Sequence, residues 1–166
     1  MRNIRSIGFV FGGIVSLMLL ASGCSEETLE AYLPEAELSA DRPDRYADVG
    51  VETIEESDVL VIDLGEVPVY SEIKADVIIE SINAQDLRVS KVSYVDGEVL
   101  GSRWDEPTWR KNTADQVSKV PPFTVPGGGS RIIEIPFTPM EEGAASAMVA
   151  IESNAKNGKL QYVLVK

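Results

Sequence analysis

The sequence predicts an all-β protein whose folded part, residues 57–166, is a two-layer antiparallel sandwich of about seven strands. From Ser57 onward, apolar residues alternate with polar ones in short runs, which is the period of a half-buried strand. Gly, Pro and Asn separate these runs, and no convincing helical period interrupts them. A segment of about 110 residues is long enough to bury one such core.

The alternation predicts strands, in chain order, at residues 60–64, 73–79, 87–94, 133–137, 147–151 and 160–165. In the third of them the apolar positions change phase between Val89 and Val92, which indicates a β-bulge. Pro136 has no amide proton to donate, so its strand is expected to lie at a sheet edge or to end there. Residues 154–158 contain two Asn and a Gly and are expected to turn the chain into the last strand.

The N-terminus has the features of an export signal. Arg2 and Arg5 precede an uncharged, largely apolar stretch at residues 7–20, and small residues follow. This stretch is shorter than the roughly 20 residues that span a bilayer. Residues 20–24 (LASGC) resemble the bacterial lipobox, which implies cleavage after Gly23 and a diacylglycerol lipid on Cys24. The alternative is a plain signal peptide with an accidental cysteine.

The position of the cysteine favours lipidation. Cys24 is the only cysteine, so a disulfide within the chain is impossible. Stable membrane anchoring takes two or more acyl chains. The lipobox resemblance implies that Cys24 carries them. Ser25 differs from the aspartate that retains enterobacterial lipoproteins at the inner membrane, so the resemblance favours the outer membrane. Residues 25–27 (SEE) also resemble an acidic surface-export tag, which leaves the periplasmic face and the cell surface both open.

Residues 24–56 are interpreted as the lipidated cysteine followed by an extended acidic tether. The segment is rich in Glu, Asp, Ala and Pro and shows no sustained hydrophobic period. Its closely spaced carboxylates repel one another and favour an extended chain. The predicted organisation is therefore a cleaved signal at 1–23, a tether at 24–56 and the sandwich at 57–166.

Composition excludes several kinds of chemistry. The chain contains no histidine, so Ser-His-Asp and Cys-His nucleophiles and His-based zinc sites are ruled out. Removal of the signal, with its two arginines and no acidic residue, changes the net charge from −12 to −14. Such a surface repels phosphate backbones, so nucleic acid is not expected as a partner. We expect no catalytic residues, no metal and no cofactor other than the lipid on Cys24.

Six short motifs are spread over the predicted sandwich, in chain order residues 63–69 (DLGEVPV), 81–83 (SIN), 87–92 (LRVSKV), 123–130 (FTVPGGGS), 135–143 (IPFTPMEEG) and 149–154 (VAIESN). Together they resemble the immunoglobulin-like domain shared by the major sperm protein, Hydin-type (ASH) domains and bacterial relatives such as choice-of-anchor D modules. The departures are Leu64 for the usual aromatic, Tyr70 for a frequent glycine, and a long insert at 96–122. The resemblance implies an immunoglobulin-like fold with a binding or scaffolding role, and no catalytic residues.

The insert at 96–122 contains the candidate binding residues, Trp104, Trp109, Arg103 and Arg110. A loop of this length is commonly functional, and Trp and Arg often anchor interfaces. The alternative is that both tryptophans cap the open end of the sandwich and cover an edge strand.

The predicted function is that of a membrane-anchored, non-enzymatic envelope lipoprotein whose domain binds another envelope protein. Recognition would use the 96–122 loop or strand addition at an exposed edge. The alternative is binding of carbohydrate or cell wall through Trp104 and Trp109.

Overall fold

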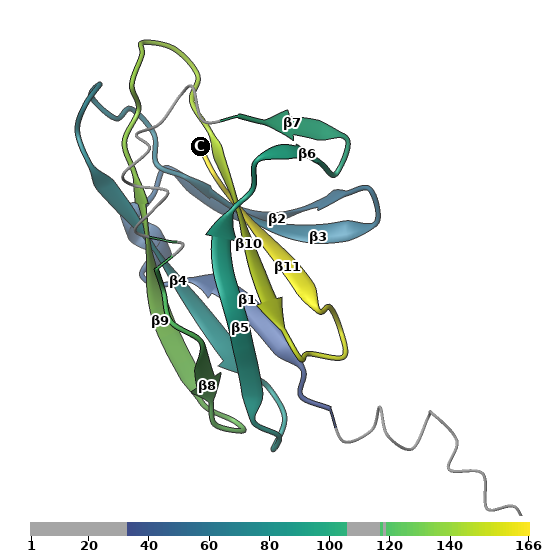
Figure 1. Ribbon diagram of the computed structural model, residues 1–166. Coiled ribbons are helices and arrows are strands. Elements are labelled where there is room, and N and C mark those ends of the chain that lie inside the picture. Colours follow the sequence, from purple (N-terminus) through teal and green to yellow (C-terminus); the bar gives the residue numbers. More distant parts are fainter. Residues whose placement is uncertain (1–32, 106–116, 118) are drawn as a thin grey trace, which may run out of the picture.

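The computed structural model describes residues 33–105, 117 and 119–166. The export signal, Cys24, Trp109 and Arg110 lie outside the described residues. Within the described ranges, strands dominate and pack in two layers (Figure 1), which confirms the predicted all-β sandwich. The strands are β1 (Ala36–Ala40), β2 (Asp48–Ile54), β3 (Ser57–Asp63), β4 (Ile73–Ser81), β5 (Leu87–Tyr94), β6 (Gly97–Val99), β7 (Ser102–Trp104), β8 (Phe123–Val125), β9 (Ser130–Phe137), β10 (Ala147–Ser153) and β11 (Leu160–Val165), with a 3-10 turn at Pro43–Arg45.

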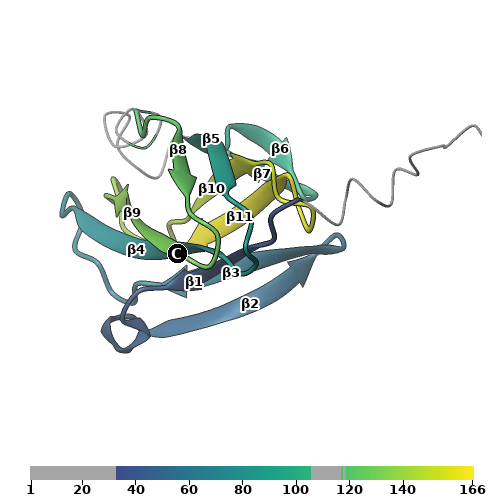
Figure 2. The ribbon, with the colours of Figure 1, turned by 90° about the horizontal axis from the view of Figure 1, so that it is seen from below.

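The two layers differ in width. One sheet has three strands in the order β1-β4-β9, and the other has six in the order β2-β3-β11-β10-β5-β8. Neighbouring strands are antiparallel except β3 and β11, which run parallel, with Tyr162 opposite Val59. The chain changes sheets after β1, so β1, an edge strand of the narrower sheet, lies across from β3, the strand next to the edge strand β2 of the wider sheet (Figure 2).

The expected boundary of the sandwich at residue 57 is wrong. Residues 36–54, assigned to the tether, form β1 and β2, which pair with β4 and β3 respectively. The acidic composition hid both strands. The buried residues of β1 are two small alanines, Ala36 and Ala40, while most residues of β2 are exposed on both faces, so neither strand shows a clear apolar stripe.

The main core lies between the layers, where the predicted inward positions of the strands meet. Ala75, Val77 and Ile79 of β4 are fully buried and face the inward side chains of the six-stranded sheet. Burial of this kind contributes roughly 1.5–3 kcal/mol for each large aliphatic side chain. The core also includes Leu60, Ile62, Leu87, Val89, Val92, Val117, Val125, Ile133, Ile135, Phe137, Val149, Ile151, Val163 and Val165.

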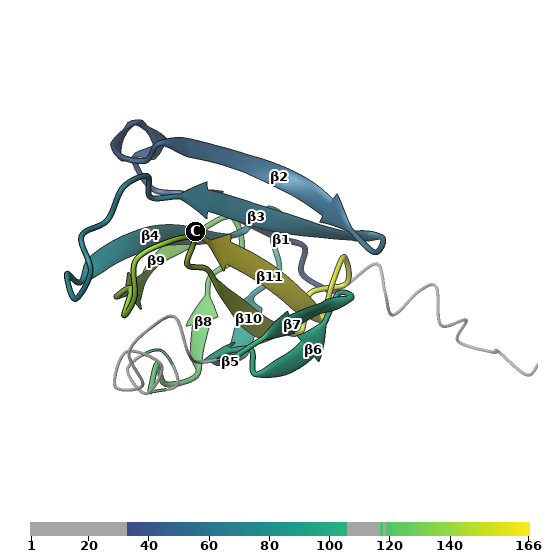
Figure 3. The ribbon, with the colours of Figure 1, turned by 90° about the horizontal axis from the view of Figure 1, so that it is seen from above.

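A second apolar cluster lies on the outer face of the six-stranded sheet, formed by Val59, Val61, Met148, Ala150, Tyr162 and Leu164. The hairpin of β6 and β7, which is the first part of the predicted 96–122 insert, covers this cluster with Val99, Leu100 and Trp104. The β2–β3 and β6–β7 hairpins project in the same direction (Figure 3). Their tips are neighbours, because a Cβ at Gly101 would come within 2.5 Å of Glu55 Oε1.

Three local predictions are confirmed. Ser153 pairs with Val89 and Glu152 with Lys91, so Ser90 is the extra residue of a β-bulge in β5. β9, which contains Pro136, is an edge strand that pairs with β4 alone among the described strands. Residues 154–158 connect β10 to β11.

Candidate functional site at the free edge of strand β1

The described residues of the predicted loop site do not form an exposed platform. Trp104 is partly buried against the second cluster, and its Nε1 is buried without a hydrogen-bond acceptor among the described residues. It covers the outer face of a sheet, whereas the capping alternative had placed it at the open end of the sandwich. Arg103 is exposed and pairs with Asp105 at 2.6 Å, which raises the pKa of the Arg103 guanidinium. Trp109 and Arg110 fall outside the described residues.

A different site is formed by the free edge of β1. In the β1–β4 ladder, Ile82 donates to the carbonyl of Glu35, and Asp41 donates to the carbonyl of Asp76. Hydrogen-bonded pairs alternate along an antiparallel ladder, so the odd-numbered residues of β1 bond to β4. The N–H and C=O groups of Ala36, Leu38 and Ala40 therefore point to the opposite side, where no further strand of the described residues pairs with β1.

Ala36 shows what this edge can bind. The backbone N–H of Ala36 donates to Asn157 Oδ1 at 2.9 Å, and Asn157 Nδ2 donates back to the Ala36 carbonyl at 2.7 Å. A second amide, Nε2 of Gln161, reaches the same carbonyl at 3.3 Å. The Asn157 carboxamide thus makes the pair of bonds that a residue of an added strand would make. Leu38, two residues further on, has no such partner among the described side chains.

The wider sheet extends past β1 and leaves a groove. Val51 of β2 pairs with Leu60, so its side chain points to the core side of the sheet, yet it is 63% exposed. The three-stranded sheet ends before it can cover this position. The resulting groove has a volume of about 410 Å³. Its lining comes from β1, the β2–β3 hairpin and the β10–β11 turn, namely Ala36, Glu37, Leu38, Val51, Glu56, Ser57, Asp58, Leu60, Asn157, Gly158, Leu160 and Gln161.

The charged residues that line the groove are all acidic. Its lining includes the carboxylates of Glu37, Glu56 and Asp58 and no basic residue. Among the described residues none of the three makes a salt bridge, although Asp58 accepts a hydrogen bond from Thr53 at 2.9 Å. Glu37 lies directly opposite Glu80 of β4, a pairing that destabilises a sheet. The groove therefore combines an apolar floor with an acidic rim.

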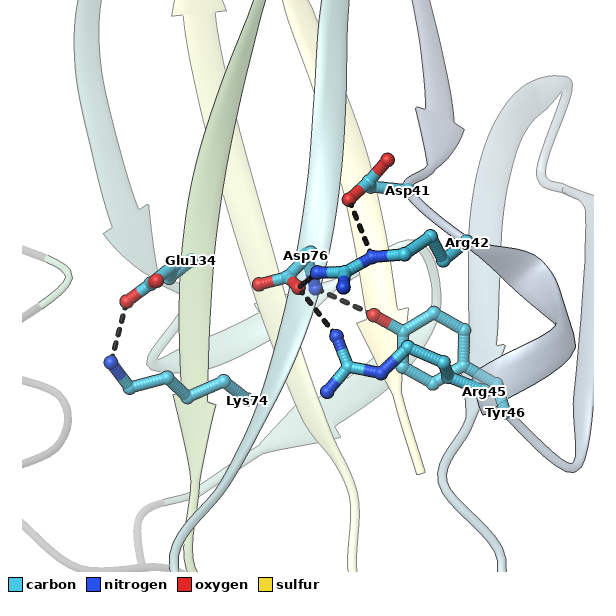
Figure 4. Close-up of polar contacts among 7 residues, drawn as sticks. All are labelled: Asp41, Arg42, Arg45, Tyr46, Lys74, Asp76 and Glu134. Atoms are coloured by element: carbon cyan, nitrogen blue, oxygen red, sulfur yellow. Dashed lines mark hydrogen bonds and ion pairs between the residues drawn. The ribbon is translucent and has the colours of Figure 1, made fainter.

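The far end of β1 is closed by a polar cluster around Asp76 (Figure 4). One carboxylate oxygen of Asp76 contacts Arg42 Nη2 at 3.3 Å and Arg45 Nη1 at 3.1 Å. The backbone N–H of Asp76 donates to the Tyr46 hydroxyl at 2.8 Å, where a continued β1 would otherwise bond. This cluster fixes the crossover from β1 to β2 and β1 ends at Ala40, so the accessible edge is the short stretch from Leu38 to Ala40.

Sequence reasoning missed this site because its partners are remote. Asn157 was interpreted as a turn residue, and the separation of 121 residues from Ala36 gives no local signal. The described part of the chain contains no cluster of three or more potential metal ligands. It also contains no helix that is long and apolar enough to cross a membrane.

Comparison with known proteins found no matching family model and no matching curated protein. Among solved structures, the chain is similar to the ASH / PapD-like domain of human CEP192 (PapD-like domain 7), with 13% sequence identity and a TM-score of 0.42. The similarity covers 77% of this chain and 89% of that domain.

Proposed function

We propose that the mature chain is a lipid-anchored, non-enzymatic envelope lipoprotein that binds an extended segment of another protein by strand addition at β1. The observation that carries this proposal is the free β1 edge beside a groove whose floor exposes Val51. An open edge presents backbone groups that pair with any extended chain, and the side-chain pockets beside it select among such chains.

The edge is better suited to recognition than the described part of the 96–122 insert. Trp104 is already packed on the protein's own sheet, and Arg103 is paired with Asp105. At the edge, by contrast, the backbone of Leu38 and the side chain of Val51 remain available to a partner. The placement of Trp104 likewise gives no support to the glycan-binding alternative.

Anchoring through Cys24 would keep the groove close to the bilayer. Cys24 and Leu33 are nine residues apart in sequence, so this stretch reaches at most about 30 Å. The groove begins three residues later, at Ala36. A partner segment would therefore be captured near the membrane, as suits an assembly module of the envelope.

Site-specific photo-crosslinking in cells tests the protein-binding function. A photoreactive phenylalanine analogue at Val51 is expected to trap a partner protein, whereas the same analogue at Ile132, an exposed residue on β9 at the other edge, is not. Equal capture from both positions, or none from Val51, would reject the edge as the binding site.

Metabolic labelling with palmitate tests the anchor independently. The wild-type chain is expected to take up label and to fractionate with the outer membrane, and Cys24→Ala is expected to lose the label. An exported chain that carries no lipid would refute this part of the proposal.

A further inference from the structure

We infer that the segment bound at β1 is a short extended peptide in which basic residues alternate with apolar ones. This inference rests on the proposed function and specifies its partner. Each step follows from what an added strand would meet along its backbone, on its inner face and on its outer face.

The backbone of β1 limits the length of the segment. Leu38 and Ala40 offer their N–H and C=O groups to a new strand, while Asn157 occupies the same groups of Ala36 and β1 ends at Ala40. The ladder is therefore confined to the stretch around Leu38 and extends past Ala36 only if Asn157 is displaced. A segment of about three to five residues spans this stretch at about 3.3 Å per residue.

The inner face of an added strand would be apolar. Side chains of neighbouring strands that point to one face lie about 5 Å apart. An inward residue would thus lie beside Leu38 and above Val51 and Leu60, which form the floor of the groove. The side chain of Val51 is 63% exposed when no segment is bound. A bound segment would cover it and would add a fourth strand to the narrower sheet.

The outer face of the same strand would meet negative charge. Glu37 points outward from β1 and already lies opposite Glu80, and Glu56, at the tip of the β2–β3 hairpin, also lines the groove. Lysine or arginine at the outward positions would relieve the repulsion between Glu37 and Glu80. Acidic residues at those positions would add to it. Since successive strand residues point to opposite faces, the preferred segment alternates basic and apolar residues.

A second copy of this chain fits the edge poorly. The chain carries a net charge of −12, and edge-to-edge pairing of two β1 strands would bring two Glu37 side chains to one interface. The charge of the groove thus favours a basic partner over self-association.

The test measures fluorescence anisotropy with full-length protein in detergent and a labelled eight-residue peptide of alternating Lys and Val. Its counterpart carries Glu in place of each Lys. The Lys peptide is expected to bind at least about tenfold more tightly, a difference that narrows as salt rises. Equal affinities of the two peptides, or no binding of either, would overturn the inference.

Proline substitutions locate the binding site. Leu38→Pro removes only the outward N–H of β1. It is expected to lower the affinity for the Lys peptide by about tenfold. Ile132→Pro is the matched control, because it removes an outward N–H from the other edge strand, β9, and should leave the affinity unchanged. A Leu38→Pro variant that is folded by circular dichroism yet binds like the wild type would also overturn the inference.

The two proposals can fail separately. If Val51 traps a partner in cells but neither peptide binds, strand addition stands and the basic-apolar preference is wrong. If the Lys peptide binds selectively but Val51 traps nothing, the chemical preference of the groove stands and its role in partner binding is wrong.

Discussion

The side chain of Asn157 makes two hydrogen bonds to the backbone of Ala36, 121 residues away, and so occupies the first position of a sheet edge that is otherwise open. A turn residue of the β10–β11 connection is thereby the terminal partner of β1. This contact both protects the edge and competes with any segment that would extend along it.

Asn157→Ala is expected to change stability and binding in opposite directions. Loss of two partly buried hydrogen bonds should lower the free energy of unfolding by about 1–2 kcal/mol, measured by urea denaturation. The affinity for the Lys peptide should rise by about tenfold, because the peptide then displaces only the longer Gln161 bond at 3.3 Å to pair with Ala36. Asn154→Ala is the control. It removes the hydrogen bond that the Arg88 backbone N–H donates to Asn154 Oδ1, away from the edge, and should cost stability only. An unchanged affinity in Asn157→Ala would contradict the competition.

The β2–β3 hairpin contains a strained turn that can be relieved. Ile54 pairs with Ser57, so the loop has only two residues, and both Glu55 and Glu56 adopt positive φ, 46° and 65°. Such two-residue turns favour Asn-Gly, since the left-handed region is unfavourable for residues with a Cβ. Glu56→Gly is expected to raise the free energy of unfolding by about 1 kcal/mol. Glu52→Gly, in the extended part of β2, should lower it by a similar amount. Equal effects of the two substitutions would refute the argument from backbone strain.

Asp76 is expected to be the most important charged residue for the stability of the fold. Its side chain is 12% exposed and binds two arginines of the crossover, whereas Glu134 is 58% exposed and binds only Lys74, at 2.5 Å. Asp76→Ala should lower the free energy of unfolding by about 2 kcal/mol, because it removes hydrogen bonds to charged groups. Glu134→Ala should change it by less than about 0.5 kcal/mol. Thermal unfolding of both variants distinguishes them, and similar losses would show that the crossover does not depend on Asp76.

The sequence predicted most of the sandwich because its inner positions obey a simple period. Ala75, Val77 and Ile79 of β4 are fully buried and alternate with outward residues that are polar except Ile78, and the bulge near Ser90 was evident from a change of phase. β3 and β10 are buried on both faces, a consequence of the hairpin that covers the second cluster. Their apolar runs therefore give no indication of which face is the core.

The candidate site could not be predicted in the same way. It consists of a strand edge that no described strand covers and of contacts between residues that are far apart in the sequence. Glu37, Val51 and Asn157 meet at one groove only after the chain has changed sheets between β1 and β2. The acidic composition that led to the tether interpretation is the same property that gives the groove its negative rim. Charge could be counted from the sequence, whereas its position on a strand edge required the fold.

Alkaline pH is expected to destabilise the fold through Tyr94. Its hydroxyl donates to the Pro136 carbonyl across the core, and burial, followed by the charge of Glu72, raises the pKa of the Tyr94 hydroxyl above its ordinary value. The folded state therefore retains a proton that the unfolded chain releases above about pH 10. The stabilisation is complete below that pH and is lost as the pH rises further.

Urea denaturation of wild type and Tyr94→Phe between about pH 9 and pH 12 measures this contribution. Tyr94→Phe should be less stable than the wild type at neutral pH and should show a smaller alkaline decrease. Burial also raises the pKa of Tyr162, so Tyr162→Phe serves as the comparison. If the free energy of unfolding of Tyr94→Phe decreases at alkaline pH as much as that of the wild type, another group causes the effect.

Trp104 is expected to stabilise the fold and to have no direct part in binding at β1. It packs with Val99 and Leu100 on the second cluster, away from the groove, so Trp104→Ala should lower the free energy of unfolding by about 2 kcal/mol. Arg103→Ala, on the exposed side of the same hairpin, should change it by less than about 0.5 kcal/mol. Both variants should bind the Lys peptide as the wild type does. If Trp104→Ala instead keeps full stability but loses the partner trapped from Val51, the insert at 96–122 would be the recognition surface, and the β1 edge would be secondary to it.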